Sequence, residues 1–227
     1  DGKTISKGMN ERGKYDSEGF RIQEKNPKPM EKLHLVSAFL VDQCLSLGQE
    51  KVNSKENEII AIPRLLDSLE LHQGDIITID AIGTQKEIVS QIIEKQADYL
   101  LEVKGNQPIL MESIEDAMEA VRKFHECEYL KEFSEREEGH GLIVNRTCRT
   151  CSDVYFLGRI FKQWEGIRTF GYIDNWRIDK ATGEDVTERH YFITSLENDP
   201  KRILKFKRKH WGIENGLHWQ QIGRAHV

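Results

Sequence analysis

The stretch DIITIDAIGTQKEIVSQIIEKQADYLLEVKGNQ, residues 75–107, decides the fold class of this chain. Two apolar runs, residues 76–79 and 99–103, have the length of buried strands, and Asp80 ends the first. Between them lies a helical pattern from about residue 85, whose apolar stripe consists of Ile88, Val89, Ile92 and Ile93. Strand, helix and strand in this order predict an α/β layer with a partly parallel sheet.

The flanking segments extend this pattern in both directions. An amphipathic helix is predicted over residues 108–124. Upstream, residues 33–41 and 46–52 predict two strands joined by a tight turn. A helix is expected to begin at Ser54. Pro63 falls inside its apolar pattern and can split this helix in two.

Residues 127–188 have a different texture, with alternating β-branched and aromatic residues between Gly and Asp turns. Strands are expected at residues 143–147, 154–157 and 169–178, which together predict an antiparallel β insertion. A strand at residues 191–196 and a last helix from Pro200 through Trp219 follow.

Composition and charge bound the class of protein. The chain has 227 residues, of which 38% are hydrophobic and 31% charged, as in ordinary globular domains. Its apolar runs are too short to cross a bilayer, so we expect no membrane contact. The net charge of −5 argues against a uniformly basic, DNA-binding surface. However, acids cluster in residues 126–138 and bases in residues 201–209, and local patches matter more than the sum.

The four cysteines do not form a dense disulfide framework, so a reducing, cytoplasmic location is expected. Cys148 and Cys151 form a C-x-x-C pair with His140 as the nearest other candidate ligand. A zinc site usually needs a second such pair or a His pair. We therefore expect two small apolar side chains on a strand.

Two carboxylates lie where a metal could bind. Asp80 ends a predicted central strand, at the edge where open α/β sheets bind ligands, although such an Asp is also a common helix cap. Glu214 lies on the last helix and shares a face with His210 and His218, four residues away on either side. The two histidines are two turns apart, which is too far for them to share one zinc ion. The alternative to a metal-binding role for this face is a polar face exposed to solvent.

Several strings along the chain resemble the transposases of the H-repeat-associated insertion-sequence family. They are DGKT (1–4), LHLVSAF (33–39), KENEI (55–59) with AIP (61–63), TIDA (78–81) with GTQK (83–86), DY (98–99) with KGNQ (104–107), GHG (139–141), HW (210–211), IEN (213–215) and LHW (217–219).

The resemblance implies an RNase H-like α/β fold, a mixed sheet flanked by helices with an antiparallel β insertion before the last catalytic helix. It implies a DDE transposase whose catalytic and metal-binding residues are Asp1, Asp80 and Glu214, holding two Mg²⁺ (or Mn²⁺) ions. The activity would be DNA strand cleavage at transposon ends and strand transfer to target DNA. The partner would be double-stranded DNA, and the active complex would be a homo-oligomer.

Given the resemblance, the bases before Glu214 are candidate phosphate contacts, the alternative being a solvated helix face. They are Lys201, Arg202, Lys205, Lys207, Arg208, Lys209 and His210. Lys104 and Asn106, after a strand, are further DNA-binding candidates. Related transposases often carry a Tyr and an Arg before the Glu; here those slots hold Lys207 and His210, and Arg208 is the candidate substitute.

These patterns divide the chain into four segments. Residues 1–126 form the first part of the core, with a truncated first strand; 127–188 form the β-rich insertion; 189–220 carry a core strand and the catalytic helix. Residues 221–227 match a translated sequencing adapter (ATC GGA AGA GCA CAC GTC for 222–227), so we expect an artefact. We therefore expect an inactive fragment of a transposase; the alternatives are a non-catalytic DNA-binding remnant and a non-transposing nuclease of the same fold.

Overall fold

The structure is a computed structural model that describes residues 2–6, 32–43, 45–53, 57–123, 128–139 and 141–223. For residues 2–6, 32–33 and 213–223 it describes the backbone alone.

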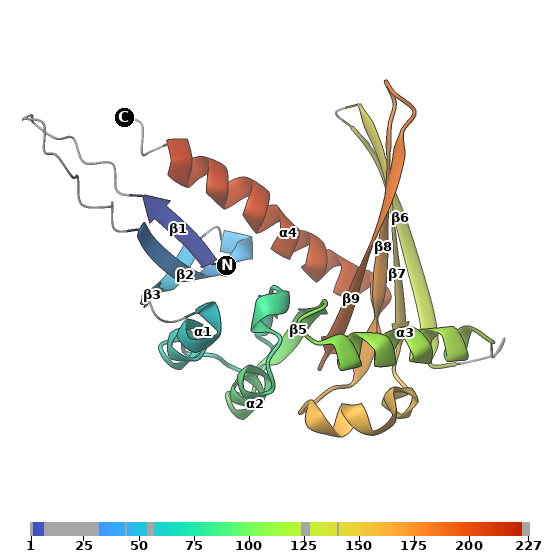
Figure 1. Cartoon of the computed structure of the whole chain (residues 1–227), viewed down its shortest axis with the longest axis horizontal. Coiled ribbons are helices and arrows are strands. Elements are labelled where there is room, and N and C mark those ends of the chain that lie inside the picture. Colours follow the sequence, from blue (N-terminus) through green and yellow to red (C-terminus); the bar gives the residue numbers. More distant parts are fainter. Residues whose placement is uncertain are drawn as a thin grey trace, which may run out of the picture.

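The strands form two sheets (Figure 1). The smaller sheet is antiparallel, with the order β1 (Gly2–Ser6), β2 (Lys32–Leu40) and β3 (Leu45–Val52). The larger has six strands in the order β4-β5-β9-β8-β7-β6. Their bounds are Ile76–Ile79 for β4, Asp98–Val103 for β5, Leu130–Gly139 for β6, Leu142–Cys151 for β7, Thr169–Asp179 for β8 and Asp185–Thr194 for β9. Strands β4 and β5 are parallel, and the other pairs are antiparallel.

Helices cover both faces of the larger sheet. Their bounds are Glu58–Asp67 for α1, Lys86–Glu94 for α2, Pro108–Lys123 for α3 and Pro200–Gly223 for α4, with 3₁₀ helices η1 (Val41–Gln43), η2 (Ala81–Gly83) and η3 (Val154–Gln163). One core joins α1, α2, α3 and η3 to the face that carries Tyr99 and Phe170. A second core joins Ile203 and Leu204 of α4 to the opposite face, at Leu100 and Phe192. Figure 1 shows α4 crossing from this sheet toward the smaller one.

The parallel pair is the part of the fold that positions Asp80. Ile88, Val89 and Ile92 form the buried stripe of α2, as the helical spacing predicts. Because the crossover through α2 returns the chain beside β4 as a parallel strand, the carboxyl ends of β4 and β5 meet at one edge. The prediction of a partly parallel α/β layer is confirmed.

The β-rich region is also confirmed as antiparallel. Strands β6 to β8 lie within residues 127–188, and β9 runs across residue 188. All four belong to the same sheet as β4 and β5. The result is a mixed α/β fold with a six-stranded sheet flanked by helices, consistent with an RNase H-like fold.

Two local predictions were wrong. The strand expected at residues 154–157 is part of η3: the Asp153 carboxylate accepts a hydrogen bond from the Tyr155 N–H at 3.2 Å, and Gly158 has φ 64°, outside the strand region. Pro63 does not split α1, which runs continuously through it. Burial of Ile62 and Leu65 offsets the hydrogen bond that proline cannot donate.

Candidate catalytic site

Asp80 follows the last residue of β4 and precedes η2, at the carboxyl edge of the parallel pair. Its side chain is 36% exposed, so the carboxylate reaches both solvent and the interior. Its Oδ1 accepts a hydrogen bond from Nε2 of His210 on α4 at 2.9 Å. This hydrogen bond outweighs burial and lowers the pKa of Asp80 below its usual value. The carboxylate is therefore anionic at neutral pH.

The imidazole of His210 is held at both nitrogens. Nδ1 lies 3.0 Å from Oγ1 of Thr78 on β4. Because a carboxylate can only accept, Nε2 carries the proton, and in the neutral ring Nδ1 accepts from the Thr78 hydroxyl. His210 is only 4% exposed. Thr78, His210 and Asp80 thus form one hydrogen-bonded chain between β4 and α4.

A buried ionic network lies beside the hydrogen bonds that join Thr78, His210 and Asp80. Glu102 on β5 is 2% exposed and accepts from Nζ of Lys207 at 2.8 Å and from Nδ1 of His190 at 2.9 Å. Nζ of Lys104 lies 3.0 Å from the same carboxylate. Burial raises the pKa of Glu102, but these hydrogen bonds outweigh it and hold that pKa well below its usual range. Burial lowers the pKa of Lys207, and Glu102 opposes that effect.

The loop after β5 supports η2 and hence Asp80. The Asn106 side chain donates to the Ala81 carbonyl at 2.5 Å, and the Gln107 side chain donates to the Thr84 carbonyl at 2.9 Å. The Thr84 hydroxyl donates to the carbonyl of Glu102 at 2.6 Å. The KGNQ string therefore connects the ends of β4 and β5.

The structure places the predicted catalytic residues unevenly. Asp80 lies at the site described above, while Asp1 lies outside the described residues. Glu214 lies on α4, four residues beyond His210, and its side chain is outside the described part of the chain. Among the side chains that the structure describes, no group of three His, Cys, Asp or Glu could hold a metal. The triad stays a prediction.

The predicted DNA-binding residues of α4 lie on two different faces of the helix, one outward and one buried. Lys205 is exposed, and Arg208 and Lys209 are half-buried on the outer face. His210 is 4% exposed and faces Asp80 in the interior, and Lys207 is 1% exposed. Neither of these two expected phosphate contacts therefore lies on the outer face of α4. On the β5 side, Lys104 is exposed beside Glu102, and Asn106 is engaged with η2.

Sequence reasoning missed three residues of the site: Glu102, His190 and Thr78. Glu102 could have been found, because a carboxylate inside the apolar run of residues 99–103 needs a buried partner. For His190 and Thr78 no local signal exists, since their partners come from distant segments.

The C-x-x-C pair behaves as expected of apolar side chains. Cys148 packs with the α4-side core, whereas Cys151 belongs to the core on the opposite face. Residues three apart on a strand point to opposite faces, so the two thiols do not converge on one site.

No helix in the described part of the chain is both long and apolar enough to span a membrane.

The α/β topology, with a carboxylate at a strand end and a helix packed across the sheet against it, is consistent with the RNase H-like class. Within that class the chain belongs to the family described as Transposase DDE domain, whose model matches residues 6–222.

Relatives of known name agree with this family. YncI of Escherichia coli O157:H7 is 37% identical over 228 residues, covering 96% of this chain and 52% of the relative. YbfL of E. coli K12 is 33% identical over 190 residues, covering 83% of this chain and 50% of the relative. The H repeat-associated YhhI of the same strain is 32% identical over 190 residues, with 83% and 50% covered. YncI and YhhI carry the word transposase in their names. The chain spans about half the length of these relatives.

Proposed function

We propose that this domain is the catalytic core of an insertion-sequence transposase, which cleaves DNA at transposon ends and transfers the strand to target DNA. Asp1, Asp80 and Glu214 are its proposed catalytic carboxylates. The contact between His210 and Asp80 carries the proposal, because it brings α4 to the end of β4.

The helix geometry supports the position of Glu214. Four residues advance an α-helix by about 6 Å and a little more than one turn, so Glu214 follows His210 on nearly the same face. Since the His210 ring meets Asp80 directly, the backbone at Glu214 lies one turn from that contact. A carboxylate at this position suits a shared site with Asp80.

The chemistry of the donors fits divalent cations. Mg²⁺ and Mn²⁺ prefer oxygen ligands, and Asp80 is a half-exposed carboxylate. Among the described residues, Oδ2 of Asp80 has no hydrogen-bond partner, which leaves that oxygen available. Two ions bound by the three carboxylates would activate the attacking oxygen and stabilise the leaving one.

The chain's own residues orient the Asp80 carboxylate. Carboxylates that bind metals are themselves hydrogen-bonded by outer residues, as Oδ1 is by His210. Thr78 fixes the imidazole, and the buried pair of Lys207 and Glu102 fixes α4 against β5 one turn earlier. The proposed contacts to DNA remain Lys104, Asn106, Lys205, Arg208 and Lys209. Assembly into a homo-oligomer also remains part of the proposal.

A binding experiment tests the site without requiring activity. Mn²⁺ binding to this chain is measured by the relaxation of water protons, for the wild type and for Asp80→Asn. We expect the Asn variant to bind at least about tenfold more weakly, because the loss of an outer partner alone costs 10- to 100-fold. The matched control is Asp116→Asn, an exposed aspartate on α3, which should leave binding unchanged.

Activity is tested in a longer transposase of this family, at the aspartate in the position of Asp80. Its change to Asn should abolish strand cleavage in Mg²⁺ and leave DNA binding largely intact, because the amide keeps the shape of the side chain and loses its charge. Unchanged cleavage, or Mn²⁺ binding that is equal in the Asp80→Asn and wild-type chains, would refute the role.

A further inference from the structure

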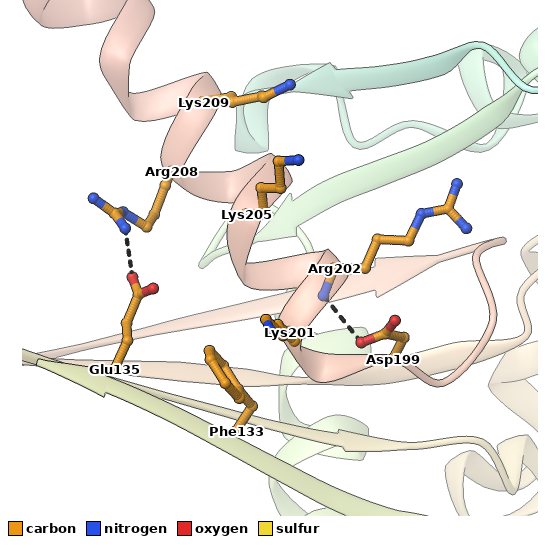
Figure 2. A pocket seen from close by; sticks show the side chains of 8 residues that line it. All are labelled: Phe133, Glu135, Asp199, Lys201, Arg202, Lys205, Arg208 and Lys209. Carbon is orange, nitrogen blue, oxygen red and sulfur yellow. Dashed lines mark hydrogen bonds and ion pairs between the residues drawn. The ribbon is translucent and has the colours of Figure 1, made fainter.

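A groove of about 640 Å³ lies between α4 and β6 (Figure 2). Most of its lining is cationic and comes from α4. These cations are Lys201, Arg202, Lys205, Arg208 and Lys209. Phe133 and Glu135 of β6 face them, and Asp199 precedes the helix.

The cations form a stripe along the helix. Their positions follow the helical period, on the side opposite the buried Ile203, Lys207 and His210. The nine residues from Lys201 to Lys209 span about 12 Å of helix axis. The groove therefore lies on the outer face of α4, away from the face that meets Asp80.

Two of the five cations are engaged by carboxylates. Arg208 lies 2.9 Å from Glu135 and also pairs with Glu137, and Lys209 pairs with Asp42. These pairs hold the stripe against β6 and η1.

The other three cations are exposed. Within the described part of the chain, no carboxylate lies within 4.0 Å of the charged groups of Lys201, Arg202 or Lys205. Nζ of Lys201 lies 5.7 Å from the centre of the Phe133 ring, and the Arg202 guanidinium lies 5.5 Å from that of Phe206. The rings orient two charges without neutralising them.

We infer that this groove binds the sugar-phosphate backbone of duplex DNA, with Lys201, Arg202 and Lys205 as the phosphate contacts. The inference rests on the proposed function and locates its DNA contact on the outer face of α4. Lys201 and Arg202 join Lys205 there, while Arg208 and Lys209 are engaged by carboxylates. One DNA strand presents a phosphate about every 3.4 Å of duplex axis. The assigned contacts, Lys201 to Lys205, span about 6 Å of helix axis and match roughly two phosphates. A single small anion would need cations that converge on one point, and these are spread along a line.

Glu135 and Glu137 act as internal competitors of DNA. They hold the Arg208 guanidinium, which a phosphate could otherwise contact. Removing their charges should release Arg208 and add about one phosphate contact. The groove thus predicts variants that change DNA affinity in opposite directions.

The experiment measures the affinity of the chain for a 20-base-pair duplex of random sequence, in EDTA, over a range of NaCl concentrations. In Lys201→Gln/Lys205→Gln, affinity at 0.1 M salt should fall at least about tenfold. The slope of log K against log salt should fall by about 2, since each phosphate contact contributes about 0.9. In Glu135→Gln/Glu137→Gln, affinity should rise several-fold and the slope by about 1.

The matched control is Arg159→Gln/Lys162→Gln, which removes two exposed positive charges from η3 on the other face of the sheet. It should change the slope by less than about 0.5. Lys201 and Lys205 are exposed, so the groove variant should keep the wild-type thermal unfolding midpoint.

Three results would overturn the inference: no salt-dependent duplex binding by the wild type, an unchanged slope in the Lys201/Lys205 variant, or an equal loss in the control. Mn²⁺ binding measured on the same variants separates this failure from failure of the catalytic proposal. A chain that keeps Asp80-dependent Mn²⁺ binding but lacks groove-dependent DNA binding refutes the groove alone.

Discussion

Replacing Glu102 by Gln should destabilise the protein strongly at neutral pH. The change keeps the shape of the side chain and removes the charge opposite the Lys207 ammonium, which is 1% exposed. Removing one partner of a buried ion pair costs about 3–5 kcal/mol, because the other charge is left in a medium of low polarity. His190 and Lys104 also lose the carboxylate that they contact.

A second variant separates the ion pair from general packing. In Glu102→Gln/Lys207→Met no uncompensated ammonium remains, so stability should recover by about 1–3 kcal/mol relative to Glu102→Gln alone. Urea unfolding, followed by the fluorescence of the buried Trp164, measures each free energy of unfolding without adding salt.

The pH dependence of Glu102→Gln supplies a further check. Burial lowers the pKa of Lys207, and without Glu102 that pKa falls further below its value in the unfolded chain. A lysine whose folded pKa is depressed destabilises the fold fully below that pKa, and the penalty shrinks as pH rises from the folded pKa toward the unfolded value of about 10.4. The deficit of Glu102→Gln should therefore shrink between pH 7 and pH 10. The reasoning fails if Glu102→Gln is as stable as the wild type at pH 7, or if the double variant is less stable than the single.

Three other outcomes follow from single residues. Gly171→Ala should cost at least about 1–3 kcal/mol in urea unfolding, because its Cβ would lie 2.0 Å from the backbone oxygen of Arg149; wild-type stability would contradict the strand packing. Burial raises the pKa of Cys148, so iodoacetamide at pH 8 should label this thiol only after unfolding, and rapid labelling of the folded chain would argue against its burial. The hydrogen bond from His210 lowers the pKa of Asp80 in the folded chain. The ionised carboxylate therefore stabilises the fold at pH values above its unfolded pKa of about 3.9, and this stability is lost as pH falls through the folded pKa. Asp80→Asn should make acid unfolding less steep below about pH 4, and an unchanged slope would show that the pair adds no stability.

The amino-acid sequence by itself determined the elements around Asp80. The stretch of residues 75–107 contains two apolar runs and one helical stripe, and all three became β4, α2 and β5. These patterns are local, because a strand repeats every two residues and a helix every 3.6. The error at residues 154–157 has a local cause as well, since the cap at Asp153 and the backbone of Gly158 outweighed the strand-like composition.

Tertiary structure alone decided which charges of α4 point inward. In the run KFKRKH, residues 205–210, the lysines are chemically alike, yet Lys207 is buried while Lys205 is exposed. The phase of α4 against the sheet selects Lys207, and Glu102, 105 residues earlier, supplies its counter-charge. His210 likewise meets Asp80 across 130 residues of sequence. The sequence pattern carries spacing along one element, whereas these pairs depend on the distance between elements that only the packed fold defines.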